Sequence, residues 1–178
     1  MAEALHAADN FFLQDVVSLR SGTQAYLGRG ADVCADDAAI EMLQTALTIE
    51  IVCVWRYTMM SVSDRGLRDE RVGFEFQEQA NDERRHTRMV AERIEQLGGT
   101  PNFRPHGLMS PLAVEHVSSL DFDDMIAENL AAERSVVEYY NDLINHFRMS
   151  DPLTTAMLET ILQDEEDHAT DMQDLLTS

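Results

Sequence analysis

The sequence predicts an all-α protein built around a bundle of four long helices. Apolar residues recur every three or four positions over residues 36–63, 67–97 and 121–147, and again from residue 152 onward. That spacing places apolar side chains on one face of a helix. The first and third links are short, whereas the middle link, residues 100–119, is long. We therefore expect two antiparallel helical hairpins joined by a crossover.

Residues 1–35 are predicted to form an N-terminal arm, and residues 36–178 the bundle. The arm has a cluster of apolar residues between positions 11 and 19, which predicts a short amphipathic helix. Gly22 and two further glycines then interrupt the chain. The sequence does not indicate what this arm does.

The first two helices of the bundle have glutamates in the middle of their apolar faces. Asp36 or Asp37 is the expected cap of the first helix, and Gly98 and Gly99 form a typical end for the second. The inward-facing residues of the first helix are predicted to be Leu43, Leu47, Glu50, Val54 and Tyr57. Those of the second are predicted to be Val72, Phe76, Gln79, Glu83, His86, Val90, Ile94 and Leu97.

The crossover contains prolines that exclude a long helix. Ser110 as a cap and Pro111 at the first helical position allow a short helix over residues 111–118. His106 and His116 lie in this link, and we interpret them as surface residues.

The last two helices repeat the arrangement of the first two. Asp151 and Pro152 mark the start of the fourth helix, as a capping residue followed by proline at the first helical position. The inward-facing residues of the third helix are predicted to be Ile126, Leu130, Glu133, Val137, Tyr140, Ile144 and Phe147. Those of the fourth are predicted to be Leu158, Ile161, Glu165, His168, Met172 and Leu175.

The composition narrows the possible functions. The chain has 33 acidic and 13 basic residues, for a net charge of −20, and all the basic residues are arginine. Such a charge repels a phosphate backbone, so DNA binding is unlikely on electrostatic grounds. Two cysteines are too few for a disulfide scaffold, which favours a reducing, cytoplasmic location. We see no signal peptide and no run of about 20 apolar residues, and we expect no membrane span.

A doubled pattern of glutamate and histidine carries the functional prediction. Glu-x-x-His occurs at Glu83–His86 and at Glu165–His168, and a single glutamate precedes each copy by 33 and 32 residues, at Glu50 and Glu133. Residues three apart lie one helical turn apart on one face. Four buried carboxylates would repel one another, whereas two divalent cations would balance them. Carboxylates with one imidazole per ion suit iron or manganese.

With these residues the chain resembles the ferritin-like superfamily, and within it bacterioferritins and the Dps-like ferritins that have a bacterioferritin-type centre. The resemblance spans about residues 36–176 and includes the turn after the second helix, Gly98-Gly99-Thr100-Pro101-Asn102. It implies two irons per chain, with manganese or zinc as substitutes. It makes Glu50 and Glu133 terminal ligands, Glu83 and Glu165 bridging ligands, and His86 and His168 ligands to one iron each.

Two residues near this centre leave alternatives open. Tyr57 matches a tyrosine beside the bacterioferritin centre, where it is either an electron donor or a core residue with a satisfied hydroxyl. Cys53, three residues after Glu50, is either a buried thiol or a redox group.

The departures from bacterioferritin shape the expected assembly. Arg84 stands where bacterioferritins have a haem-ligating methionine, so we expect no haem there. We expect no fifth helix, and the crossover is long; both features resemble the Dps type and favour a homo-oligomeric cage of 12 chains over 24. The metal ligands are expected within one chain.

The resemblance and the ligand pattern together predict a ferroxidase. It would oxidise Fe(II) with O2 or H2O2 and store Fe(III) in the cage. The alternative is a small di-iron or di-manganese peroxidase, catalase or oxidase without mineral storage. A DNA-coating protein is disfavoured by the charge.

Overall fold

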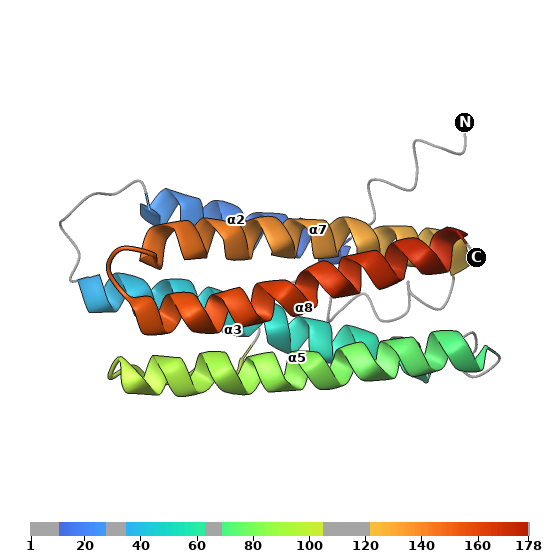
Figure 1. Cartoon of the computed structure of the whole chain (residues 1–178), viewed down its shortest axis with the longest axis horizontal. Coiled ribbons are helices and arrows are strands. Elements are labelled where there is room, and N and C mark those ends of the chain that lie inside the picture. Colours follow the sequence, from blue (N-terminus) through green and yellow to red (C-terminus); the bar gives the residue numbers. More distant parts are fainter. Residues whose placement is uncertain (1–10, 28–34, 63–68, 105–121, 178) are drawn as a thin grey trace.

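The computed structural model describes residues 11–27, 35–62, 69–104 and 122–177 (Figure 1). Within these segments all the regular structure is helical. The helices are α2 (Phe11–Leu27), α3 (Ala35–Ser61), α5 (Glu70–Gln96), α7 (Phe122–Phe147) and α8 (Pro152–Thr177). The predicted all-α class is confirmed, whereas the possible short helix over residues 111–118 lies outside the described residues.

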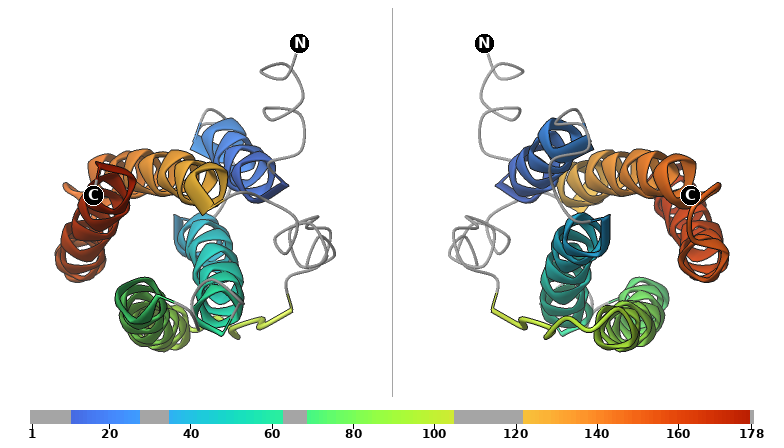
Figure 2. Two further views of the ribbon diagram at one scale, coloured as in Figure 1. Left: turned by 90° about the vertical axis from the view of Figure 1, so that its right-hand side faces the viewer. Right: turned by 90° about the vertical axis from the view of Figure 1, so that its left-hand side faces the viewer.

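The four long helices form the predicted bundle. Helix α3 packs along α5 and α7 packs along α8, so the two hairpins are those expected from the short links. Seen end-on, α3, α5, α7 and α8 surround a common axis (Figure 2). Each helix turns its apolar face toward this axis, where a single buried core forms.

Local sequence signals fix several helix ends. The side chain of Asp69 accepts hydrogen bonds from the backbone N–H groups of Arg71 and Val72 and so caps α5. At the other end Gly98 has φ +85°, a conformation that favours glycine, and α5 ends as predicted. The Asp151 carboxylate accepts the Thr154 N–H at 3.0 Å and caps α8. Two expected starts were wrong: α3 begins at Ala35, before its expected caps, and α5 begins three residues later than predicted.

The predicted inward faces are buried with few exceptions. On α3, Val54 is only half-buried, and Cys53 takes the inward place at 1 % exposure. On α7, Val137 is half-buried as well. Steps of three then four and of four then three both lead from Glu50 to Tyr57, so spacing alone did not decide between Cys53 and Val54.

Helix α2 lies outside the four-helix arrangement, against α7 and α3 (Figure 2). Its Arg20 forms ion pairs with Glu138 and Asp142 of α7, and Val16 is buried in the core. The predicted amphipathic helix thus exists, but the expected break at Gly22 was wrong because α2 continues to Leu27. The division of the chain into arm and bundle stays a prediction.

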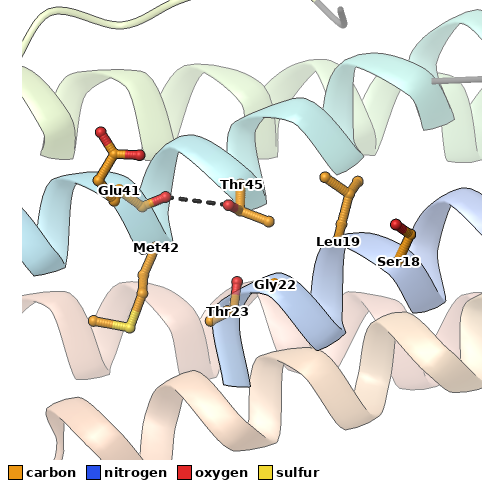
Figure 3. A pocket seen from close by; sticks show the side chains of 7 residues that line it. All are labelled: Ser18, Leu19, Gly22, Thr23, Glu41, Met42 and Thr45. Carbon is orange, nitrogen blue, oxygen red and sulfur yellow. Dashed lines mark hydrogen bonds between the residues drawn. The ribbon is translucent and has the colours of Figure 1, made fainter. Parts of the chain in front are cut away.

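A small cavity of about 180 Å³ separates α2 from α3 (Figure 3). Gly22 and Thr23 line it from α2, and Met42 and Thr45 line it from α3. Thr45 donates its hydroxyl hydrogen bond to the Glu41 carbonyl of its own helix at 3.1 Å. The cavity therefore marks where the packing of α2 on the bundle is incomplete.

Helix α3 has the composition of a membrane-spanning helix. By length and composition alone, the Asp37–Ser61 stretch of α3 is apolar enough to cross a membrane. More than half of its most apolar window is buried inside the bundle, as is usual for a core helix. The stretch is apolar because much of it is buried in the core of the bundle. The buried Glu50 lies within the same stretch.

Candidate metal centre

The six predicted ligands come together in the middle of the bundle. Each of the four helices contributes one of the four glutamates. All six residues are at most 3 % exposed. Their potential ligand atoms form two groups, each with all atoms within 4.8 Å of one another. The first half-site consists of Glu50, Glu83, His86 and Glu165, and the second of Glu83, Glu133, Glu165 and His168. Glu83 and Glu165 belong to both half-sites, as expected of bridging residues.

In the first half-site three carboxylates converge on one histidine nitrogen. Nδ1 of His86 lies 3.3 Å from Glu50 Oε2, 3.3 Å from Glu83 Oε2 and 3.1 Å from Glu165 Oε1. A single ring nitrogen has one hydrogen at most, so it cannot satisfy all three carboxylates. A cation among these four groups would satisfy them together.

Polar neighbours hold the first half-site from outside. The Tyr140 hydroxyl donates a hydrogen bond to Glu50. Nε2 of His86 lies 3.1 Å from Asp164 Oδ2, and Arg85 donates to the same oxygen at 2.9 Å. Partners of this kind orient ligating side chains and fix the histidine ring.

The second half-site has fewer such partners. Nδ1 of His168 lies 3.4 Å from Glu83 and 3.6 Å from Glu165, and its Nε2 lies 3.7 Å from Asp82. Both carboxylate oxygens of Glu133 and both ring nitrogens of His168 are buried without a hydrogen-bond partner among the described residues. Buried polar atoms normally have partners, so these atoms indicate a missing ligand.

The pKa shifts in the centre also indicate an excess of buried negative charge. Burial, followed by the charge of Glu165, raises the pKa of Glu133 well above its usual value. Burial and the charge of Glu50 raise the pKa of Glu83. Burial lowers the pKa of His168, but the nearby carboxylates of Glu165 and Glu83 outweigh it and raise the pKa to about 12. The centre thus binds protons strongly in place of other cations.

The residues present therefore fit two divalent metal ions. Four carboxylates balance four positive charges, and the unpartnered oxygens and nitrogens supply the ligand atoms. Oxygen donors with one imidazole for each ion suit iron, manganese or zinc. Which metal binds, and the roles of the six residues as ligands, stay predictions.

Comparison with known proteins identifies the family. Residues 40–178 match the family model of the ferritin-like domain. The chain belongs to the ferritin-like family. A similar solved structure is a dodecameric thioferritin, the bacterioferritin-related protein from Bacteroides fragilis, with 25 % sequence identity and a TM-score of 0.69. The match covers 88 % of this chain and 92 % of that one, whereas no curated protein matches.

These comparisons confirm the predicted ferritin-like resemblance and bundle. The family match begins at residue 40, within α3.

Tyr57, the seventh predicted site residue, is buried and makes no hydrogen bond to any of the six predicted ligands. Its ring stacks on Phe76 with a centroid distance of 5.9 Å, and its buried hydroxyl has no partner among the described residues. Both interpretations of Tyr57, as an electron donor and as a core residue with a satisfied hydroxyl, stay predictions.

Sequence reasoning missed three residues that adjoin the centre. Tyr140 was assigned to the core face only, yet it binds Glu50. Asp82 and Asp164, which face His168 and His86, were not assigned at all. The internal repeat contained the signal: each tyrosine follows its glutamate by seven residues, and each aspartate directly precedes a bridging glutamate.

Cys53 is buried next to the centre. Burial, followed by the charge of Glu83, raises the pKa of its thiol well above the usual value, which keeps the thiol protonated. Cys34 lies outside the described residues. A redox role for Cys53 stays a prediction.

Proposed function

We propose that this ferritin-like protein is a ferroxidase that stores iron. The observation that carries the proposal is the pair of buried four-residue groups sharing Glu83 and Glu165. Carboxylates that belong to both half-sites would hold two iron ions close together. A two-electron oxidant needs such a pair, because each Fe(II) ion donates only one electron. Family membership supports iron as the substrate.

The proposed reaction balances in electrons and protons. Two Fe(II) ions lose one electron each. O2 takes up these two electrons and two protons to become H2O2, or H2O2 takes up two electrons and two protons to become water. The charge in the centre rises from four to six during oxidation. The four carboxylates balance two Fe(II) ions but not two Fe(III) ions, so hydroxide from water would balance the remaining charge as Fe(III) hydrolyses toward the stored mineral.

The side chains of the centre have separate tasks in this proposal. Glu50 and Glu133 each bind one ion, and His86 and His168 complete the two half-sites. Tyr140 positions Glu50, and Asp164 orients the His86 ring. The packed helices exclude bulk water, since all six ligands are buried.

We further propose that the stored Fe(III) lies inside a homo-oligomeric cage of 12 chains. The bacterioferritin-related neighbour is described as dodecameric, which supports this number. The net charge of −20 suits an assembly that attracts cations and repels DNA.

An aerobic Fe(II) titration of the purified protein tests storage. We expect soluble Fe(III) to accumulate far beyond about two ions per chain, the capacity of one centre of the di-iron kind. If uptake stops at about two, the same ligands serve a catalytic centre, and the alternative of a non-storing peroxidase, catalase or oxidase replaces this proposal.

A further inference from the structure

An acidic cavity lies beside the centre, between α5 and α8. The cavity has a volume of about 220 Å³. Its lining includes Glu75, Gln79 and Asp82 from α5 and Asp167, His168 and Asp171 from α8. No basic side chain other than His168 belongs to the lining among the described residues. The cavity therefore concentrates negative charge at one place on the seam between two helices.

The acidic cavity reaches the second half-site directly, and it reaches the first only through Asp164, which lines the cavity and whose Oδ2 lies 3.1 Å from Nε2 of His86. His168 lines the cavity and is also a member of the second half-site. On the side of the first half-site, Arg85 bridges Asp82 and Asp164 at 2.9 Å each and neutralises that rim. Only the His168 side chain would thus separate a cation in the cavity from Glu133 and Glu165.

Gln79 provides an observation independent of the acidic residues. Its side chain is 1 % exposed and lines the cavity. Its Nε2 donates to Glu75 Oε1 at 3.2 Å, but its Oε1 is buried without a hydrogen-bond partner among the described residues. A buried carbonyl oxygen without a donor is unfavourable, and a cation would satisfy it.

Glu75 and Asp171 lie on opposite sides of the same cavity. Burial, followed by the charge of Asp171, raises the pKa of Glu75. Two carboxylates that line one cavity in this way repel each other, and a bound cation would relieve that repulsion. With the Gln79 carbonyl they offer three oxygen donors, which is the ligand type that hard divalent cations prefer.

We propose that Glu75, Gln79 and Asp171 bind one divalent cation in the acidic cavity and pass it to His168 of the second half-site. This inference rests on the proposed function, because it assigns a loading site to the same centre. Transfer needs no redox step: the ion exchanges oxygen ligands of the cavity for the ligands of the second half-site.

The test removes either the carboxylate charges or the amide oxygen of the cavity, with little change in side-chain volume. One variant combines Glu75→Gln with Asp171→Asn, and a second carries Gln79→Met alone. The matched control combines Glu92→Gln with Glu159→Gln, which removes the same charge from exposed positions of α5 and α8. Circular dichroism and size-exclusion chromatography establish that each variant is folded and assembled, and the second variant serves if the first does not fold.

Equilibrium dialysis with Co(II) counts the ions that each protein binds. We expect the wild type and the control to bind about one ion per chain more than either cavity variant. In stopped-flow oxidation at low Fe(II), the cavity variants should have a KM for Fe(II) about tenfold higher, with kcat nearly unchanged.

Equal Co(II) stoichiometry and equal KM in the cavity variants and the control would overturn the loading site and leave the proposed function standing. A wild type that binds Co(II) in the cavity but does not oxidise Fe(II) would contradict the proposed function instead. Failure of the two proposals is therefore distinguishable.

Discussion

The two half-sites of the metal centre come from the same sequence pattern but differ in how firmly they are held. Tyr140 binds Glu50, whereas the equivalent Tyr57 leaves Glu133 without a partner. His86 is 3.1 Å from its aspartate, Asp164, and the equivalent distance from His168 to Asp82 is 3.7 Å. An internal repeat thus produced one more preorganised half-site, in which Glu50 and His86 each have a hydrogen-bond partner, and one in which Glu133 and His168 have none among the described residues. In both half-sites some carboxylate oxygens stay unpartnered.

This difference has an energetic consequence. Ligands that are already oriented lose less freedom when an ion binds, so the first half-site should bind metal more tightly. The second half-site adjoins the acidic cavity and can exchange its ion more readily. A tight half-site next to an exchangeable one suits a centre that must both hold Fe(II) and release Fe(III).

The largest effect should follow from removing a residue that both half-sites share. Glu83→Ala takes one carboxylate from each group, so rapid Fe(II) oxidation should fall by more than about 100-fold while helix content and assembly persist. Glu92→Ala, an exposed position on the same helix, is the control and should oxidise Fe(II) normally. Stopped-flow absorbance measures both, and unchanged kinetics in Glu83→Ala would refute the ligand assignment.

Removing one histidine at a time should separate the two half-sites. His86→Ala and His168→Ala should each bind one Co(II) tightly per chain under anaerobic conditions. The ion kept by His168→Ala occupies the preorganised half-site, and its affinity should exceed that of the ion kept by His86→Ala by about tenfold. Calorimetric titration gives both affinities. Equal values would mean that the two half-sites are equivalent in solution.

The tyrosines offer a comparison that leaves all ligands in place. Tyr140→Phe removes the donor to Glu50 and should lower the Fe(II) oxidation rate by about tenfold. Tyr57→Phe removes a hydroxyl without a partner in the described structure and should change the rate less than about twofold. Should Tyr57→Phe prove as slow as Tyr140→Phe, Tyr57 would have the electron-donor role that the sequence left open.

The smallest effect concerns the stability of the metal-free protein. The pKa of Glu133 is raised in the folded state, so the folded state binds a proton more strongly than the unfolded state does. Its stability contribution must then decrease as the pH rises above the ordinary glutamate value of about 4.3. The raised pKa of His168 acts in the same direction above about 6.5.

We therefore expect the Tm of the chelator-treated protein to fall between pH 5 and pH 8, and divalent metal to reverse the fall. Glu133→Gln should raise the metal-free Tm at pH 8 by about 2–4 °C, which corresponds to about 1 kcal/mol for a chain of this size. The exposed Glu166→Gln is its control. A metal-free Tm that rises with pH would show that the buried carboxylates do not repel one another.

Much of the fold was predictable because helical periodicity determines which residues face inward. It placed Glu50, Glu83, Glu133 and Glu165 on the buried faces of four helices, and the Glu-x-x-His spacing placed the histidines beside them. Periodicity does not say which residue lies opposite across the bundle. The contact between Tyr140 and Glu50 therefore could not be read from either helix alone.

Other features depend on packing between elements that are distant in the sequence. The docking of α2 rests on Arg20 with Glu138 and Asp142, more than a hundred positions away. Gly22 was expected to break α2, but tertiary contacts outweigh the low helix propensity of a single glycine. The acidic cavity likewise forms only because α5 and α8 run antiparallel and bring Glu75 near Asp171.

The most direct test of the centre is a crystal structure of the protein loaded anaerobically with Co(II), with anomalous scattering to locate the ions. We predict two peaks in each chain, one among Glu50, Glu83, His86 and Glu165 and the other among Glu83, Glu133, Glu165 and His168. The first peak should be the stronger at limiting metal. Metal bound only outside these two groups, or no metal in the bundle at all, would contradict the proposed centre.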